Sequence, residues 1–363
     1  MATKPFTPVD LRWNAASGRV GHPDQLADAT LAEFLDGPQR HVRFVQLRDA
    51  GGFEARVLVD RGFDLGEVRV QGIPLGWRSP TGFRAPSLTN LVEEDGSGLL
   101  RSFDGFLVTC GLDHVRGPAT GPAAHFGTRR EKVFYPLHGR IASQPARLQG
   151  YGVLLGGERM TLWCEGEARQ SMLYGENLSL SRRLEMPAGS GDIVLTDVVR
   201  NEGHTPAPHM LMYHFNLGYP LVDTGTRLVM PTGAASAIAG TQPAPAGERM
   251  PDEVEDHASR AGSDLPLQCA VVNGLLGSGI AVGLNFSAAE LPRLQIWRNR
   301  SPGFNVLALE PATNGLGTRS AHERDARLQM LQPGEERRYT LKLALRYGDE
   351  AIADLERTLG AGG

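Results

Sequence analysis

The sequence has little cysteine, and the cysteines that it has are widely spaced. Among its 363 residues the only cysteines are Cys110, Cys164 and Cys269, and no two of them form a C-x-x-C pair. The spacing therefore gives no sign of a disulfide framework or of a thiolate metal site. The N-terminal residues contain no apolar core of a secretory signal. No apolar run approaches the roughly 18 residues of a membrane span. We therefore predict a cytoplasmic protein with reduced thiols and no membrane partner.

Lysine is also scarce. Of 37 basic side chains only Lys4, Lys132 and Lys342 are lysines, which leaves 34 arginines. The formal net charge of -4 gives the chain no general attraction for nucleic acid. Arginine supplies planar hydrogen-bond donors that suit oxygen-rich ligands. A small oxygen-rich molecule is therefore a better candidate partner than nucleic acid.

The common catalytic motifs are missing as well. The chain has no G-x-S-x-G elbow, no P-loop, no G-x-G-x-x-G and no H-E-x-x-H. If the protein is an enzyme, its catalytic residues must therefore come from separate parts of the chain.

Short β segments dominate the sequence from His41 onward. Leucines at 178, 180 and 184 alternate with polar residues, which is the period of a half-buried strand. Helical patterns are too few for a parallel βαβ protein. We therefore predict an all-β, mostly antiparallel domain. Its expected strands cover residues 43–47, 53–59, 68–70, 106–109, 178–185, 193–200, 268–272, 280–284, 294–297, 306–309 and 339–345.

Two helices and one long loop are expected around this β domain. Pro23 near a first turn and Gly37 past an end predict a helix between them, so residues 1–40 are expected to form an N-terminal helical extension. Ile352, Leu355 and Leu359 predict a short amphipathic helix at the C-terminus. Residues 41–363 should then form a single domain, with a loop or insertion near 232–264 that is poor in large apolar residues.

Glu310 is the most unusual polar residue in the chain. It follows the apolar run 306–309 directly, and we expect Pro311 to end this strand because proline has no ladder donor. A carboxylate at the end of a buried strand is costly unless something pairs with it. Two interpretations remain open: a structural ion pair with an arginine, or a general base tuned by partial burial.

Two histidines occupy similar positions next to β segments. His138 precedes Gly139, and His214 lies inside the apolar run 212–218. A satisfied core histidine is the more ordinary interpretation of each. His204, His209 and His214 are close in sequence, but His209 and His214 are separated by an odd number of residues and should point to opposite faces of a strand. We therefore expect no metal site.

Three short segments occur in this order along the chain: residues 137–139 (Leu-His-Gly), 213–217 (Tyr-His-Phe-Asn-Leu) and 309–311 (Leu-Glu-Pro). In this order the sequence resembles the galactose mutarotase (aldose 1-epimerase) superfamily. Other stretches resemble its aldose-1-epimerase-like branch of DUF4432 type, and the resemblance runs from about His41 to Tyr347. These stretches are residues 60–64, 109–112, 138–143, 175–178, 218–223 and 310–314.

The resemblance implies a β-supersandwich, in which large twisted antiparallel sheets pack face to face around a sugar cleft. It implies that Glu310 is the base that takes a proton from the anomeric hydroxyl, and that His214 is the acid that protonates the ring oxygen. His138 would bind the sugar. A carboxylate near His214 would be expected to keep it protonated, and this chemistry needs no cofactor or metal.

Further contacts to the sugar are less clearly indicated. Characterised mutarotases carry an Asn-Arg pair upstream of the first histidine, and this chain has no clear counterpart. Arg140 could supply the donor or form a structural salt bridge, Asp223 could bind hydroxyls or be a turn residue, and Trp297 could stack on a sugar or belong to the core. Other residues that could line the cleft are Glu165, Arg169, Gln295 and Asn314.

The expected function is therefore an isomerase of the aldose 1-epimerase type that acts on a small carbohydrate, as a monomer or a homodimer. Two alternatives remain open. The same cleft could bind a carbohydrate without turnover, or it could serve an isomerase or lyase that removes a proton from carbon.

Overall fold

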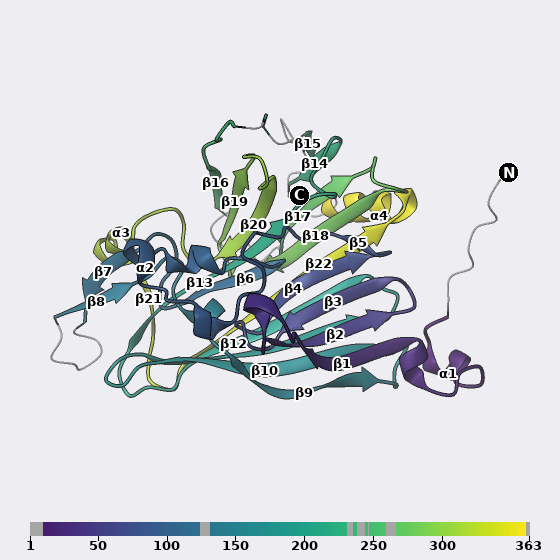
Figure 1. The fold of residues 1–363 in the computed structure, drawn as a ribbon, viewed down its shortest axis with the longest axis horizontal. Helices are drawn as coiled ribbons and strands as arrows, with labels where there is room; N and C mark the ends of the chain where they lie inside the picture. The colour runs from purple at the N-terminus through teal and green to yellow at the C-terminus, as the bar shows by residue number, and fades with distance from the viewer. Residues whose placement is uncertain are drawn as a thin grey trace.

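The computed structural model describes residues 10–123, 131–230, 235–237, 244–245, 247–258 and 266–360 (Figure 1). Antiparallel sheets make up most of the regular secondary structure of these residues, as the alternating sequence pattern predicts. The five-stranded sheet is a simple meander of β1 (Ala27–Glu33), β2 (Arg43–Asp49), β3 (Phe53–Leu58), β4 (Asp64–Val70) and β5 (Ile73–Pro74).

A nine-stranded sheet forms the largest layer. Its order is β15 (Ala235–Ala237), β14 (Thr226–Val229), β17 (Pro266–Asn273), β18 (Ile280–Ser287), β22 (Glu336–Tyr347), β12 (Asp192–Asn201), β11 (Asn177–Pro187), β10 (Thr161–Ser171) and β9 (Ala146–Leu154). Along β10 the even-numbered residues from Leu162 to Gln170 are buried and the odd-numbered ones are more exposed, so one face of this sheet looks into the core and the other looks out.

A six-stranded sheet carries the residues of most interest. It contains β16 (Glu253–Ala258), β19 (Arg293–Asn299), β20 (Val306–Ala312), β13 (Ala207–Leu217) and β21 (Gln329–Leu331), with β6 (Leu107–Leu112) also paired to β13. All 11 residues of β13 are buried, so this strand is covered on both faces. A two-stranded ribbon of β7 (Ala119–Pro122) and β8 (Lys132–Tyr135) lies beside it.

One hydrophobic core joins the three large sheets. It contains Val57 from the five-stranded sheet, Leu180 from the nine-stranded sheet and Leu309 from the six-stranded sheet. A second cluster lies on the opposite face of β13 and β20, where Met212 packs near Phe103 and Trp77 of the long segment between β5 and β6. This segment therefore covers the second face of the six-stranded sheet.

Helices are few and short. The C-terminal helix α4 (Asp349–Gly360) matches the predicted one, and its apolar side packs on β17, β18 and β22 (Figure 1). None of the helices in the described ranges is long and apolar enough to cross a membrane. The other helical segments are α1 (Trp13–Ala16), α2 (Glu93–Gly96) and α3 (Arg319–Arg324), with 3₁₀ turns at Pro23–Gln25, Gly37–Gln39, Pro86–Leu88, Gly98–Arg101 and Ile141–Ser143.

The predicted N-terminal helix is wrong. Only a 3₁₀ turn follows Pro23, and the chain then forms β1, whose Ala27 lies opposite Asp49 of β2. The backbone bonds that β2 offers at its free edge outweigh the weak helical pattern. Residues 27–33 therefore belong to the main β structure, whereas residues 1–9 lie outside the described residues.

Two further expectations need correction. β20 does not end before Pro311, because Pro311 lies opposite Leu294 of β19 and the strand continues to Ala312. The predicted loop 232–264 contains β15 and β16, and β16 pairs with β19 although Val254 is its only large apolar residue. Residues 231–234, 238–243, 246 and 259–265 lie outside the described residues.

Candidate active site

His214 and Glu310 lie opposite each other on β13 and β20. The register that pairs Met212 with Ala312 and Phe215 with Leu309 also aligns these two residues. Thr313 donates its backbone N–H to the Leu211 carbonyl at 2.9 Å, so odd-numbered pairs are the hydrogen-bonded ones. His214 and Glu310 therefore occupy a non-hydrogen-bonded position, where side chains of antiparallel strands are closest.

The two side chains are in direct contact and shielded from water. His214 Nε2 lies 3.1 Å from Glu310 Oε1, and only 4% of His214 and 1% of Glu310 are exposed. We call this pair the dyad. Neither carboxylate oxygen of Glu310 has a hydrogen-bond partner of good geometry within the described residues. The same is true of His214 Nδ1. Buried polar atoms are normally satisfied, so the dyad is suited to accept a polar ligand.

Arg116 completes the charge balance of the dyad. Its Nη2 lies 3.4 Å from Glu310 Oε2, and its side chain is 20% exposed. The Nε and Nη2 atoms of Arg116 also make no hydrogen bond to the described residues. The sequence analysis missed this residue, because the turn at 113–117 carries no recognisable motif and only the tertiary fold brings it to Glu310.

His138 is held rigidly beside the dyad. Its φ of 57° is in the left-handed region, and its backbone N–H donates to the Arg116 carbonyl at 2.8 Å. Gly111 in turn donates to the His138 carbonyl at 2.9 Å. The backbone N–H of Arg116 donates to His138 Nδ1 at 3.3 Å, so the ring carries its hydrogen on Nε2. His138 is therefore a fixed N–H donor.

Gly139 explains why this loop can approach so closely. Its φ is 75°, and a Cβ on it would collide with the carbonyl oxygens of Gly111 and His114. Glycine has no Cβ, so it permits this close backbone approach.

Aromatic rings enclose the two histidines. The His214 ring centroid lies 5.9 Å from that of His138, 5.0 Å from Phe103 and 5.4 Å from Trp297. The indole N–H of Trp297 donates to Asp252 at 3.1 Å, which fixes the ring plane. The dyad therefore lies in a weakly polar environment, in which charges interact strongly.

This environment changes the protonation of both histidines. Burial lowers the pKa of His214 below its usual value of 6.5, and the Glu310 carboxylate opposes this shift without cancelling it. Burial, followed by the neighbouring His214 and Arg116 charges, lowers the pKa of His138 as well. The carboxylate therefore favours the protonated form of His214, as expected, but desolvation is the larger effect on its pKa.

Gln295 and Asn314 line the same face as the dyad. Asp256, Gln295, Glu310 and His214 are successive neighbours across four strands. Gln295 is fully buried and donates Nε2–H to the Asn314 carbonyl at 3.0 Å, which leaves its Oε1 without a partner among the described residues.

Arg140 and Asp223 have structural contacts. Arg140 donates to the Phe134 carbonyl at 2.7 Å and lies 3.8 Å from the buried Asp113, as the salt-bridge interpretation requires. Asp223 forms a turn in which its backbone N–H donates to Thr226 Oγ1 at 2.9 Å. Its turn interpretation is therefore the one that the contacts favour.

Glu165 and Arg169 do not reach the dyad. Both are odd-numbered residues of β10 and point outward from the nine-stranded sheet. Glu165 pairs with Arg183 at 2.9 Å, and Arg169 pairs with Glu167 at 2.7 Å. Their prediction as cleft residues is wrong because sequence alone did not show which face of β10 looks inward.

The grouping of His204, His209 and His214 is accidental. His204 is exposed in a turn, and His209 Nε2 lies 2.6 Å from the Tyr339 hydroxyl on the other face of β13. In the part of the chain that the structure describes, no group of three His, Cys, Asp or Glu side chains is arranged to hold a metal ion.

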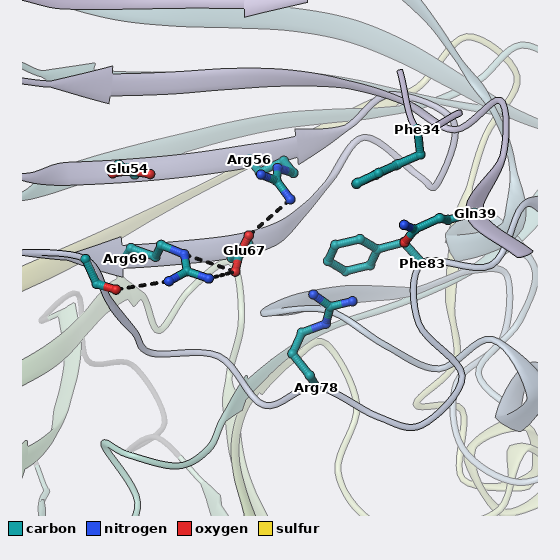
Figure 2. Close-up of a pocket in the computed structure, with 9 residues that line it drawn as sticks. Phe34, Gln39, Glu54, Arg56, Glu67, Arg69, Arg78 and Phe83 are labelled. Carbon is teal, nitrogen blue, oxygen red and sulfur yellow. Dashed lines mark hydrogen bonds and ion pairs between the residues drawn. The ribbon is translucent and has the colours of Figure 1, made fainter. Parts of the chain in front are cut away.

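A separate cavity lies on the outer face of the five-stranded sheet. It has a volume of about 600 Å³, and its floor is formed by Arg56, Glu67 and Arg69, with Arg78 and Phe83 on one side (Figure 2). Glu67 bridges Arg56 at 3.1 Å and also pairs with Arg69. These charges already satisfy one another through ion pairs and hydrogen bonds, so this cavity is a weaker candidate than the dyad, whose buried polar atoms make no hydrogen bond to the described residues.

Comparison with known proteins relates this architecture to a family and a fold. A family model described as a domain of unknown function, DUF4432, matches residues 39–345. A protein from Klebsiella pneumoniae subsp. pneumoniae MGH 78578, provisionally called an aldose 1-epimerase, is 22% identical with a TM-score of 0.79, and the match covers 92% of this chain and 87% of that chain.

Two further structures are more distant. A galactose mutarotase-like protein from Clostridium acetobutylicum is 14% identical with a TM-score of 0.58, and the match covers 89% of this chain and 99% of that one. A galactose mutarotase related enzyme from Lactobacillus acidophilus is 9% identical with a TM-score of 0.55, covering 83% and 97%. No curated protein matches the sequence. At these identities the likeness is one of fold, and the predicted β-supersandwich is confirmed.

Proposed function

This chain belongs to the DUF4432 family, and on that premise we propose that it is a cofactor-independent epimerase that interconverts the anomers of an aldose or a modified aldose. The observation that carries the proposal is the dyad itself. A buried carboxylate and a buried imidazole are 3.1 Å apart, and both carboxylate oxygens and His214 Nδ1 make no hydrogen bond of good geometry to the described residues.

The reaction needs a base at the anomeric hydroxyl and an acid at the ring oxygen, and both oxygens are bonded to the same anomeric carbon. The ionised Glu310 takes the proton from the anomeric hydroxyl while the protonated His214 gives a proton to the ring oxygen. The bond between the anomeric carbon and the ring oxygen breaks, and an open-chain aldehyde forms. Rotation about the C1–C2 bond presents the other carbonyl face. Ring closure with both proton transfers reversed then gives the other anomer.

His138 and Arg116 have the geometry to assist this step. Negative charge develops on the anomeric oxygen as Glu310 removes its proton. The guanidinium of Arg116, which is ion-paired to Glu310 but makes no hydrogen bond through Nε or Nη2 to the described residues, would stabilise this charge. The Nε2–H of His138 would orient a neighbouring hydroxyl. Fixed donors of this kind stabilise a transition state strongly in a site that excludes water.

The enclosing rings fit a sugar ligand. Pyranoses present an apolar face of C–H bonds, and Phe103 and Trp297 provide apolar surface beside His214. The polar atoms of the dyad and the aromatic rings together suit a ligand that has both hydroxyl groups and an apolar face.

The test is anomer exchange measured by NMR saturation transfer over a panel of neutral, deoxy, amino and acidic aldoses. We expect faster exchange for at least one sugar, and we expect Glu310→Gln to lose it. The control is Glu165→Gln, which makes the same substitution on the outer face of β10 and should retain the faster exchange. Failure to accelerate any sugar while binding persists would favour a binding protein. Exchange of a carbon-bound proton in D₂O would favour the proton-abstraction alternative, because mutarotation moves only oxygen-bound protons.

A further inference from the structure

The cavity on the outer face of the five-stranded sheet takes no part in the proposed reaction. Its volume of about 600 Å³ is in the usual range of sites for small ligands. Neither residue of the dyad lines it, and neither Arg116 nor His138 does. Figure 2 shows the guanidinium group of Arg78 turned toward Arg56 across the cavity. A ligand held there would therefore be separate from the substrate of the dyad.

Arg78 is fixed by contacts behind it. Its Nε donates to both carboxylate oxygens of Asp104, at 2.9 and 3.2 Å, and the backbone N–H of Ser79 donates to the same carboxylate at 2.7 Å. The Asp104 side chain is fully buried. The guanidinium carbon of Arg78 lies 3.7 Å from the centre of the Phe83 ring. Its Nη1 makes no hydrogen bond to the described residues, so a rigidly held N–H edge remains for a ligand.

Arg56 is held in a similar way on β3. Its Nε donates to the side-chain oxygen of Gln46 at 3.1 Å, its Nη1 lies 3.1 Å from Glu67, and its Nη2 has no hydrogen-bond partner in the described part of the chain. Its guanidinium carbon lies 4.6 Å from the centre of the Phe44 ring. Burial lowers the pKa of Arg56, and the positive charge of Arg78 acts in the same direction. The two guanidinium groups therefore repel each other, and an anion between them would remove this repulsion.

The glutamates of the cavity limit the charge of such an anion. Glu67 accepts from Arg69 Nε at 3.1 Å and also pairs with Arg56, so two arginines share one carboxylate. Glu54 lies two residues from Arg56 on β3, and the register places it between Arg48 and Arg69. These carboxylates are flanked by positive charge, but they would still repel a multiply charged ligand. The cavity therefore suits a single negative charge.

The rest of the lining favours hydroxyl groups. The side chains of Gln39 and Glu54 are partly exposed in the cavity and make no hydrogen bond to other described residues. An amide both donates to and accepts from a hydroxyl, and a carboxylate accepts from one. A lone carboxylate group would leave most of the 600 Å³ unfilled. A ligand whose body carries hydroxyl groups would use both side chains.

We propose that this cavity binds a small hydroxy acid with one carboxylate. The carboxylate lies between Arg56 and Arg78 and accepts hydrogen bonds from Nη2 of the first and Nη1 of the second. The hydroxyl groups of the ligand donate to Glu54 and exchange hydrogen bonds with the Gln39 amide. The site shares no residue with the dyad, so it does not depend on the proposed epimerase function.

The test is titration calorimetry with lactate, glycerate and gluconate, three hydroxy acids of increasing hydroxyl content. At least one should bind about tenfold more tightly than its neutral amide and than propionate, because the amide lacks the charge and propionate lacks the hydroxyl groups. Binding of none of the three would overturn the proposal. Equal affinity for the neutral amide or for propionate would do the same, as would tighter binding of inorganic phosphate, which carries more charge.

Two lysine variants test whether these arginines hold the carboxylate. Arg78→Lys keeps a positive charge for Asp104 but loses the planar N–H edge, and we expect binding of the hydroxy acid to weaken about tenfold. Arg56→Lys should have the same effect from the other side of the cavity, and it decides the matter if Arg78→Lys does not fold. Wild-type affinity in the folded variants would refute the assignment.

Two control variants locate the bound acid. Arg169→Lys makes the same substitution on the outer face of β10, where Arg169 pairs with Glu167 at 2.7 Å, and it should bind as the wild type does. Glu310→Gln alters the dyad and should also retain binding. Loss of binding in Glu310→Gln together with normal binding in Arg78→Lys would place the acid at the dyad and overturn the separate site.

Discussion

Replacing Gly139 with alanine tests whether the position of His138 depends on a backbone that only glycine can adopt. With φ at 75°, an alanine pays about 1–2 kcal/mol for the left-handed conformation. Its Cβ would also collide with the carbonyl oxygens of Gly111 and His114, which belong to the backbone and cannot rotate away. Overpacking of this kind costs typically 1–3 kcal/mol. Gly139→Ala should therefore lower the free energy of unfolding by about 2–5 kcal/mol.

The matched control is Gly72→Ala. Gly72 has almost the same φ, 77°, but no heavy atom of the described residues lies within 4 Å of a Cβ placed on it. It should lose only the conformational contribution of about 1–2 kcal/mol. Urea unfolding measures the two differences, and saturation transfer measures anomer exchange in the folded variants. We expect Gly139→Ala alone to reduce exchange, because His138 must move. Equal destabilisation by the two substitutions would refute the proposed clash.

Three further predictions concern ionisable groups of the core. Glu310→Gln should slow anomer exchange about 10²–10⁴-fold while circular dichroism stays unchanged; wild-type rates would remove Glu310 from the mechanism. The reaction uses protonated His214, whose pKa is lowered by burial, so kcat/KM should fall on the alkaline side with a midpoint below 6.5; a midpoint above 6.5 would contradict this assignment. Burial lowers the pKa of His209 to about 4 from 6.5. The unfolded chain therefore binds more protons between these values, and about 3 kcal/mol of stability present above pH 6.5 should be lost as the pH falls to 4. His209→Gln should flatten this dependence in urea unfolding, and an unchanged slope would show that other groups cause it.

The regular strands could be predicted because period-2 alternation reports one buried face directly. Residues 193–200 and 339–345 show it clearly, and both lie inside strands of the nine-stranded sheet. β1 and β16 lack this signal. They form because the neighbouring strands β2 and β19 offer free backbone groups to pair with. The sequences of β1 and β16 alone do not show this.

The candidate site was partly predictable for a different reason. His138, His214 and Glu310 were singled out by their order along the chain and their resemblance to a family, and the fold brings all three together. Arg116 could not be found in this way, because its link to Glu310 depends on where a turn sits in three dimensions. The protonation state of His214 depends on the balance between burial and a nearby charge, which no local pattern contains.

Pro311 shows how a correct local rule led to a wrong boundary. Proline lacks an N–H, and in the register of β13 and β20 it lies opposite Tyr213 at a hydrogen-bonded position, so one ladder bond to β13 cannot form. The strand nevertheless continues, because β20 remains paired with β19 through Pro311 and Ala312. The missing bond falls directly beside the pair of His214 and Glu310. The proline therefore does not end the strand; it weakens the ladder next to the position where His214 and Glu310 face each other inside the sheet.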